Sequence, residues 1–329
     1  MKNSLIIIMI LCSLLSCKDD NQKARDEVYI SGTLSQAGYN DVRAVYWKDG
    51  TSHVLNENAI ANAIFVTSNG DIYVAGSIAG EGKYWRNDQE TSLDGKPNAI
   101  IVSSNGDVHI TGNGFTSPDT PEPTYWKNGT KTPLTDSKIN ASTSGLFVTE
   151  NEDVYIAGNY DNKAIYWKNQ EIVHLTDSTS SASAVFVVNS DIFVAGSILK
   201  ANRYRAAYWK NNVLISVLDT VATSNSSSIY VTKNEDVYLA GWYVQGDTLQ
   251  KACIWKNGVR MVLQVPIESS SAFSSRANAI KLTDAGDIYV SGNITGHAAY
   301  WKNGVRLILN DDGEVHGSDA EGLTVRHMK

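Results

Sequence analysis

The residues of this sequence best suited to recognition chemistry are aromatic and arginine side chains in its predicted connecting segments. Tyrosine, tryptophan and arginine dominate binding surfaces because their large, partly polar side chains make strong contacts at low entropic cost. The candidate ligand-binding residues are Tyr39, Arg43, Tyr160, Arg203, Tyr204, Arg205, Trp242 and Tyr243. The alternative for Trp242 and Tyr243 is that both simply pack down on a longer structural unit.

Side chains for catalysis do not form a recognisable linear motif. The sequence has no Gly-x-Ser-x-Gly, no His-Glu-x-x-His and no P-loop. Its six histidines show no metal-ligand spacing. We therefore predict no catalytic residues, no metal and no cofactor. Enzymes of repetitive fold can carry scattered site residues, so an enzymatic function stays open as an alternative.

Composition narrows the class of partner. The chain has 329 residues, of which 42% are hydrophobic, enough for a packed core. Its 35 acidic and 28 basic residues give a net charge of -7, without a basic cluster. Nucleic acid is therefore not an expected partner. Cys253 stands where other repeats have a small apolar residue, which predicts a buried thiol rather than a reactive one.

The elements that must position these residues are repeats marked by tryptophan. Seven short phrases similar to Tyr-Trp-Lys-Asn-Gly recur 38 to 46 residues apart, and their tryptophans are Trp47, Trp85, Trp126, Trp167, Trp209, Trp255 and Trp301. A period of about 40 to 45 residues favours four-stranded propeller blades. We expect these tryptophans to be core residues, with an aromatic ligand platform as the alternative.

Each repeat also contains a run such as 71–76, which reads acid, β-branched, aromatic, aliphatic, small, Gly. Apolar residues on both faces indicate a strand buried on both sides. Another apolar run, such as 63–66, precedes it. Asn69-Gly70 and Asn105-Gly106 lie between the two runs and predict tight hairpins with positive φ at both turn residues.

Each repeat is therefore predicted to hold four antiparallel strands, here called a, b, c and d from the axis outward. The first repeat begins at strand b with Glu27, and the segment 322–326 aligns with strand a of the others. We predict an all-β, seven-bladed β-propeller in which the C-terminus supplies strand a of blade one. This one-plus-three closure removes the exposed sheet edges of an open array.

The Asn-Gly-Asp-Ile-Tyr-Val-Ala-Gly phrase at 69–76 resembles the repeat of bacterial seven-bladed propellers found on secreted and surface proteins. The tryptophan at the end of strand c is also similar to that of WD-repeat blades. The Gly-His pair and Trp-Asp dipeptide of WD repeats are missing, so the resemblance implies only geometry. It covers residues 27–326 and implies no catalytic residue.

Polar residues recur at the start of strand a, where the predicted central channel opens. They are Asn62, Asn98, Ser144, Ser183, Ser227, Asn278 and Glu321. Such a ring at the channel mouth either binds a ligand or only satisfies backbone groups and water. Farther along strand a, Lys281 and Thr324 replace an aromatic or aliphatic residue. This departure marks either a site or a tolerant seam between blades seven and one.

A basic residue follows every repeated tryptophan, and an acidic residue begins every strand b. The basic residues are Lys48, Arg86, Lys127, Lys168, Lys210, Lys256 and Lys302. We expect each to pair with the neighbouring acid across the two strands. A charged ring that grips lipid phosphates is the alternative.

The N-terminal segment is expected to be a targeting signal. A basic tip, an apolar run and Leu14-Leu15-Ser16-Cys17 resemble the signal and lipobox of bacterial lipoproteins. The resemblance implies a signal peptide over 1–16, lipidation of Cys17, a tether over 17–26 and the propeller over 27–329. Lys18-Asp19-Asp20 resembles the surface-export signal of Bacteroidetes-type lipoproteins. The alternative is a periplasm-facing anchor.

These features lead to three functional hypotheses. The first is an outer-membrane lipoprotein at the cell surface of a Gram-negative bacterium. It would be a monomer that binds a protein or glycan through its variable loops, without catalysis. The second is a lyase or glycoside hydrolase with a site at the channel mouth. The third is a structural component of an envelope complex. A deep mouth pocket around Glu321 with a perturbed carboxylate would favour catalysis.

Overall fold

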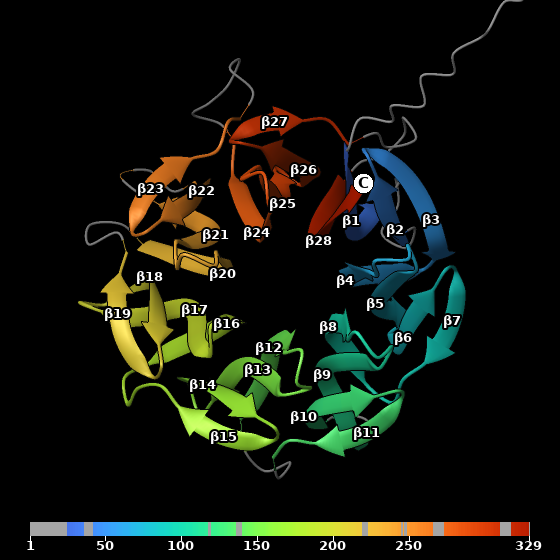
Figure 1. The fold of residues 1–329 in the computed structure, drawn as a ribbon, viewed down its shortest axis with the longest axis horizontal. Coiled ribbons are helices and arrows are strands. Elements are labelled where there is room, and N and C mark those ends of the chain that lie inside the picture. The colour runs from blue at the N-terminus through green and yellow to red at the C-terminus, as the bar shows by residue number, and fades with distance from the viewer. Residues whose placement is uncertain are drawn as a thin grey trace, which may run out of the picture.

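The protein is a ring of seven antiparallel four-stranded sheets around a central axis (Figure 1). The computed structural model describes residues 25–35, 42–117, 120–135, 140–218, 223–244, 246, 249–265, 273–309 and 317–328. The predicted all-β, seven-bladed propeller is therefore confirmed. Cys17, the tether before residue 25 and Tyr39 lie outside the described residues.

Blades are numbered in chain order, and their strands are given from the axis outward as a, b, c and d. Blade 1 contains β28 (Gly317–Met328), β1 (Arg25–Ser35), β2 (Val42–Lys48) and β3 (Thr51–Glu57). Blade 2 contains β4 (Ala59–Val66), β5 (Ile72–Ile78), β6 (Glu81–Arg86) and β7 (Gln89–Ser92). Blade 3 contains β8 (Lys96–Val102), β9 (Val108–Ser117), β10 (Thr120–Lys127) and β11 (Thr130–Pro133).

Blade 4 contains β12 (Ala141–Val148), β13 (Val154–Tyr160), β14 (Lys163–Lys168) and β15 (Glu171–His174). Blade 5 contains β16 (Ser180–Val188), β17 (Asp191–Lys200), β18 (Arg203–Lys210) and β19 (Val213–Val217). Blade 6 contains β20 (Thr223–Val231), β21 (Val237–Val244), β22 (Lys251–Lys256) and β23 (Val259–Val262). Blade 7 contains β24 (Ser275–Leu282), β25 (Ile288–Ile294), β26 (His297–Lys302) and β27 (Val305–Leu307).

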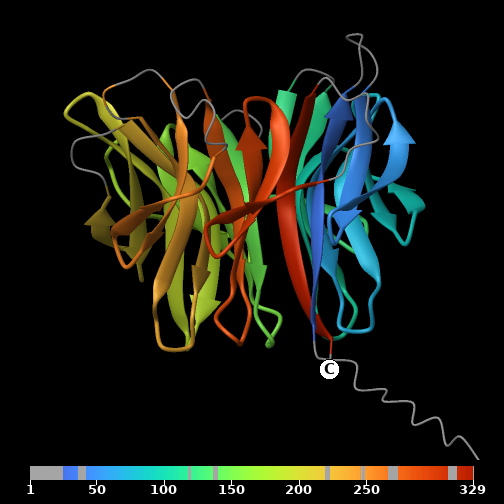
Figure 2. The same ribbon diagram turned by 90° about the horizontal axis from the view of Figure 1, so that it is seen from above.

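The ring closes through β28, which is the innermost strand of blade 1. It pairs antiparallel with β1 from Arg25 opposite Met328 to Ser35 opposite Gly317. This pairing is consistent with the predicted one-plus-three closure. The start of β1 and the end of β28 therefore lie together at one end of the ring, the lower end in Figure 2.

The connections divide between two faces of the ring. The a–b and c–d turns share one face, here called the turn face, with the start of β1 and the end of β28. The b–c and d–a connections share the opposite face, here called the loop face. Because loops of varied length and composition carry most binding residues on rigid scaffolds, the loop face is where a site is first sought.

An asparagine follows the Trp-Lys or Trp-Arg pair in blades 2 to 7, and it explains the repeated phrase because it closes the c–d turn. Asn211 has a φ of 48° and Asn212 one of 68°, the pattern of a type I′ hairpin. The Asn211 side-chain oxygen accepts a hydrogen bond of 2.9 Å from the Ile192 N–H. Its amide nitrogen donates one of 2.7 Å to Asp191. Asparagines in five other blades repeat both bonds.

The a–b turns differ from the prediction for Asn69-Gly70. Gly70 has a φ of 94°, but Asn69 is not among the residues with positive φ. The backbone instead forms a longer turn, in which Gly70 N–H donates to the Thr67 carbonyl and Thr67 N–H to the Asp71 carbonyl. The Asn69 side chain bonds Thr67 within this turn. The expectation of two positive φ angles was wrong here because the extra residues allow an ordinary turn with one left-handed glycine.

The core lies between adjacent blades and is centred on the repeated tryptophans. All seven are at most 1% exposed, which supports their expected role as core residues. Cys253 is also fully buried, as predicted. Among the residues described, no helix has the length and hydropathy that crossing a membrane would require.

The basic residue of the repeat pairs with the acid that begins strand b, as expected. Lys302 Nζ lies 2.7 Å from Asp287, and comparable ion pairs occur in blades 1, 2, 3, 5 and 6. The Lys302 ammonium also lies 5.0 Å from the centre of the Tyr289 ring. In blade 4, Lys168 lies over Tyr155 instead. Apart from the pair with the buried Glu27 in blade 1, these pairs are partly exposed to solvent, and each contributes only a few tenths of a kcal/mol or so.

Candidate functional site

A pocket on the loop face between blades 4, 5 and 6 is the candidate binding site, here called the Trp242 pocket. It has a volume of about 420 Å³. Its lining consists almost wholly of amide and hydroxyl side chains: Asn140, Ser142, Asn159, Asn162, Thr179, Ser180, Ser181, Ser197, Tyr204, Thr223, Asn225 and Trp242. The volume is within the range of small-molecule sites, which is roughly 300–1,000 Å³.

The blade repeat explains why these side chains meet. Asn159, Ser197 and Trp242 each follow the glycine of strand b in blades 4, 5 and 6. Their cross-strand partners on strand a are Ser142, Ser181 and Asn225. Three adjacent blades therefore present the same pair of positions to one pocket. The residue after this glycine is aromatic in blade 6 and a smaller polar residue in the other blades.

Hydrogen bonds connect the polar groups of the pocket across the blades. The Ser181 and Ser197 hydroxyls are 2.9 Å apart, and the Asn225 amide donates to Ser197 over 3.4 Å. Asn159 accepts a bond of 3.1 Å from the Ala182 backbone N–H. Side chains held by such bonds are preorganised, so a ligand would find donors and acceptors in fixed positions.

Two of the sequence-predicted residues lie in this pocket. Trp242 is half-buried, and Tyr204 is 45% exposed. Tyr243 points away from Trp242 because successive strand residues face opposite sides. It is only 8% exposed, and the Arg260 guanidinium lies 3.6 Å from its ring centre. The alternative of core packing therefore describes Tyr243 but not its neighbour.

The remaining candidates do not line the Trp242 pocket. Tyr160 is half-buried against the core between blades 3 and 4, with its ring 5.7 Å from that of His174. Arg203 is exposed, and Arg205 is half-buried beside the pocket residue Tyr204. Arg43 is half-buried in blade 1, far along the ring from blades 4 to 6 (Figure 1). The structure therefore does not assemble the predicted set at one place.

The predicted channel-mouth residues share a backbone feature that the sequence did not reveal. Each lies at a break in register between strands a and b, where strand a bulges by one residue. Six of them line a channel of about 430 Å³ on the axis of the ring. They are Asn62, Asn98, Ser144, Ser183, Ser227 and Asn278.

The asparagines of this ring connect neighbouring blades. Asn62 donates a 2.8 Å hydrogen bond to the Pro97 carbonyl, and Asn98 donates one of 3.0 Å to the Thr143 carbonyl. Asn278 donates to the Ala320 carbonyl over 3.0 Å. Each bond joins strand a of one blade to strand a of the next. The three amides therefore satisfy backbone groups, one of the two roles considered for the ring.

Glu321 lies beside the channel in a smaller pocket at the seam between blades 7 and 1. This seam pocket has a volume of about 270 Å³. Its lining residues are Ser274, Arg276, Asn278, Asn293, Thr295, Gly296, Asp319 and Glu321. Burial raises the pKa of Glu321 to about 7, and the Asp319 carboxylate adds to the effect while Arg276 opposes it. Burial also raises the pKa of Asp319, against hydrogen bonds from Asn293 and other groups.

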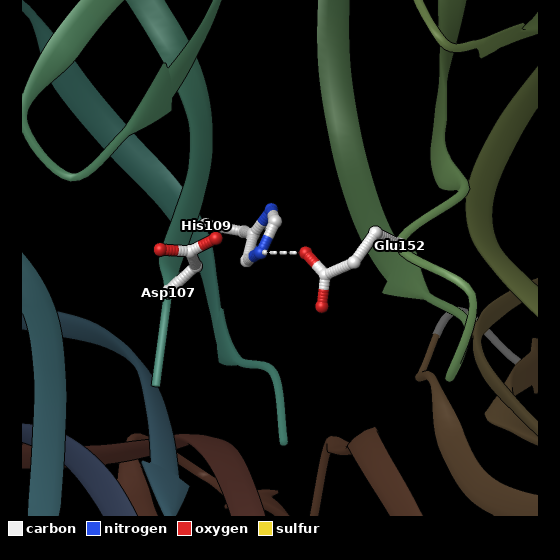
Figure 3. Close-up of side chains that lie close together, drawn as sticks. All are labelled: Asp107, His109 and Glu152. Carbon is white, nitrogen blue, oxygen red and sulfur yellow. Dashed lines mark ion pairs between the residues drawn. The ribbon is translucent and has the colours of Figure 1, made fainter. Parts of the chain in front are cut away.

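One group of possible metal ligands occurs among the described residues, on the turn face between blades 3 and 4. It consists of Asp107, His109 and Glu152, whose ligand atoms lie within 4.8 Å of one another (Figure 3). His109 Nε2 is 3.4 Å from Glu152. Two carboxylates and an imidazole are ligand types that zinc accepts.

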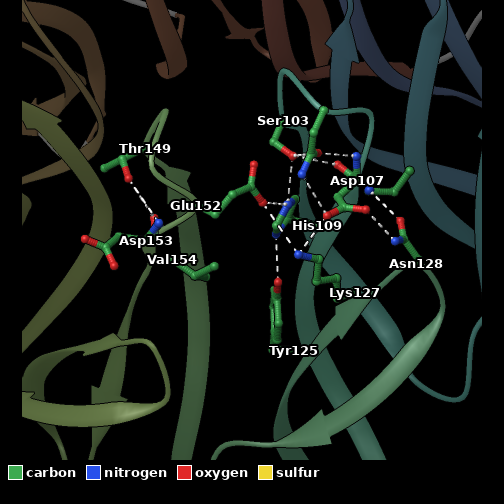
Figure 4. A network of polar contacts seen from close by, with 12 residues as sticks. Ser103, Asp107, His109, Tyr125, Lys127, Asn128, Thr149, Glu152, Asp153 and Val154 are labelled. Atoms are coloured by element: carbon green, nitrogen blue, oxygen red, sulfur yellow. Dashed lines mark hydrogen bonds and ion pairs between the residues drawn. The ribbon is translucent and has the colours of Figure 1, made fainter.

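A lysine already pairs with both carboxylates of this group. Lys127 Nζ lies 2.7 Å from Asp107 and 3.5 Å from Glu152 (Figure 4). His109 is 1% exposed, and its ring nitrogens contact the Tyr125 and Ser103 hydroxyls. Burial lowers the His109 pKa, which favours the neutral ring beside Lys127. We interpret the group as the repeated lysine–acid pair, with histidine in place of the usual aromatic ring.

The fold defines the chain as a seven-bladed β-propeller. Comparison with known proteins supports this fold class and nothing more specific. No protein-family model and no curated protein sequence matches the chain. A protein from Lactobacillus plantarum superposes with a TM-score of 0.54 at 11% identity, over 93% of this chain and 100% of that one. Virginiamycin B lyase from Staphylococcus aureus gives 0.52 at 14% identity, over 80% and 94%. At these identities the likeness shows the fold alone.

Sequence reasoning missed most of the residues of both the Trp242 pocket and the seam pocket. Asn159, Ser197 and Asn225 are ordinary polar residues whose role emerges only from their alignment with Trp242 and its partner strand. Asp319 stands two residues before Glu321 on β28, and both side chains line the seam pocket. Aligning the residue after each strand-b glycine would have given the first signal.

Proposed function

We propose that this protein is a lipid-anchored surface protein that binds a glycan in the Trp242 pocket, without catalysis. The observation that carries the proposal is the composition of this pocket. A single half-buried tryptophan stands among asparagine, serine and threonine side chains on the face where connecting loops gather.

The chemistry of a sugar ring fits this lining. One face of a pyranose carries C–H groups that pack on an aromatic ring, and Trp242 offers such a surface. The hydroxyls of a sugar need both donors and acceptors, which serine hydroxyls and asparagine amides supply together. None of the described residues that line the pocket carries a charge, which favours a neutral glycan over an anionic one.

The position of the chain start supports the proposed orientation. β1 begins on the turn face, and about ten residues separate Cys17 from Glu27. Such a tether reaches at most about 35 Å when extended. A lipid on Cys17 would therefore hold the turn face toward the membrane and leave the loop face to contact ligands outside the cell.

The test is a glycan-array screen of the full-length protein in detergent, followed by affinity measurement on any hit. Trp242→Ala should weaken binding about tenfold or more, because it removes the aromatic surface at the centre of the pocket. Asn113→Ala is the matched control, since Asn113 occupies the equivalent position in blade 3 outside this pocket. Equal affinity of wild type and Trp242→Ala would contradict the proposal.

Glycan hydrolysis or elimination at the seam pocket is the second candidate function. The raised pKa of Glu321 suits a general acid, and Asp319 lies close enough to influence it. Release of new reducing or unsaturated ends from an array hit, abolished in Glu321→Gln but not in Trp242→Ala at saturating glycan, would favour this candidate. Intact glycan after prolonged incubation with wild type would favour simple binding.

A further inference from the structure

The axial channel contains an arc of aromatic side chains that the proposed glycan site does not use. The residue three positions after the bulge lies at the same height along the axis in each innermost strand. The seven are Phe65, Ile101, Phe147, Phe186, Tyr230, Lys281 and Thr324. Ring centres of Phe147 and Phe186 are 4.9 Å apart, and those of Phe186 and Tyr230 are 5.1 Å apart. Phe147, Phe186 and Tyr230 therefore form a continuous row of aromatic rings, of which Phe147 and Phe186 line the channel.

Lys281 is the one cationic residue among these seven. It is half-buried and lines the channel of about 430 Å³. Within the described ranges its ammonium has no hydrogen-bond or ion-pair partner. Its enclosure lowers the pKa of the amine, and no neighbouring carboxylate raises it again. Thr324, on the next strand, is occupied by a 2.9 Å bond to the Ile64 carbonyl.

Other titratable groups near these seven residues do not supply a counter-charge to the Lys281 ammonium. Glu150 also lines the channel, but it is exposed on the a–b turn of blade 4. Tyr230 stays neutral, since burial raises the pKa of its hydroxyl. Glu321 belongs to the seam pocket rather than to the channel lining. An anion bound beside this half-buried ammonium would supply the counter-charge and a charge-assisted hydrogen bond.

We propose that the axial channel binds a small aromatic carboxylate, with its acid group on Lys281 and its ring against Phe147 and Phe186. The channel volume is in the range of small-molecule sites. Offset or tilted contacts with phenylalanine rings favour a flat apolar body. The channel and the Trp242 pocket share no lining residue, so the two proposals are independent.

The experiment compares two probes of the same shape by isothermal titration calorimetry on the full-length protein. Naphthalene-2-carboxylate carries the charge, and naphthalene-2-carboxamide lacks it. Wild type should bind the carboxylate about tenfold more tightly, the value expected of one charge-assisted hydrogen bond. Lys281→Met keeps the apolar stem and should abolish the preference, while Lys281→Arg should keep it. Lys233→Met, on an exposed turn of blade 6, is the matched control and should bind as wild type does.

A second measurement reads Lys281 directly. With lysines carrying ¹³C-methyl groups, NMR titration of Lys281 should show a pKa that rises when naphthalene-2-carboxylate is added, because the bound anion stabilises the ammonium. The carboxamide should leave it unchanged. No binding of the carboxylate to wild type, equal affinity for both probes, or a preference that survives in folded Lys281→Met would overturn the proposal.

Discussion

At the scale of single residues, the molecule separates repeated side chains from exceptional ones. Pairs of a basic and an acidic residue and turn asparagines recur around the ring and stabilise most blades in the same way. Lys281 and Glu321 break the repeat and have unusual electrostatic surroundings. Because ionisable groups with shifted pKa values cluster at functional sites, such exceptions are the better guide to chemistry.

Glu321 should make stability depend on pH. Its pKa rises from 4.5 to about 7 on folding, so the folded state binds more protons between those values. The contribution of Glu321 to stability should therefore decrease as pH rises through this window and stay constant above it. Chemical denaturation at about pH 5 and pH 8 should show wild type losing on the order of 1–3 kcal/mol relative to Glu321→Gln. Parallel pH dependences of the two proteins would contradict the raised pKa.

At the scale of elements, the three residues of the Trp-Lys-Asn phrase each stabilise the same hairpin in a different way. The tryptophan packs between blades, the lysine pairs with strand b, and the asparagine adopts the left-handed turn while binding the same strand. One short phrase thereby connects three of the interactions that define a blade. This explains why it recurs with so little variation.

Two substitutions of Asn211 should separate the contribution of its hydrogen bonds from the cost of its left-handed backbone. Asn211→Ala loses two hydrogen bonds and keeps a β-carbon at a φ of 48° without the polar group that helps asparagine adopt this conformation, so it should destabilise the fold by about 1–3 kcal/mol. Asn211→Gly loses the bonds but tolerates the backbone, and should cost about 1 kcal/mol less. Urea denaturation of the three proteins measures both. Equal stability of the Ala and Gly variants would mean that the left-handed backbone carries no cost.

The sequence was informative about elements and poor about sites for a physical reason. Strand order, blade number and closure follow from periodicity, which repetition makes visible seven times. The turn at Asn69 was mispredicted because local residue preference does not fix turn length. The Trp242 pocket joins Asn159, Ser197 and Trp242 from three blades, and only the packing of those blades brings them together.

At the scale of the whole molecule, one strand decides whether the ring is closed. β28 pairs with β1, and Leu323 is packed in the core between blades 7 and 1. Without it, β1 would expose an unpaired edge and blade 1 would lose its innermost strand. Exposed edges of this kind pair with other chains.

Deletion of residues 317–329 should therefore convert the protein into a species that aggregates or melts without a sharp transition. Light scattering after size-exclusion chromatography and a thermal melt followed by circular dichroism measure the two effects. Leu323→Ala is a milder companion, and should cost about 2–5 kcal/mol while leaving the ring closed. A truncated chain that stays monomeric with an unchanged melt would show that the ring does not need its last strand.

Because Arg25 pairs with Met328, the two ends of the propeller lie side by side, and the chain could begin and end at another place in the ring. Joining the two and cutting the chain at Asp161-Asn162, in the b–c turn of blade 4, would leave every blade intact. The new ends would emerge from the opposite side of the ring. A permuted molecule tethered there would have the reverse orientation, with its short hairpins facing the surroundings in place of its long loops.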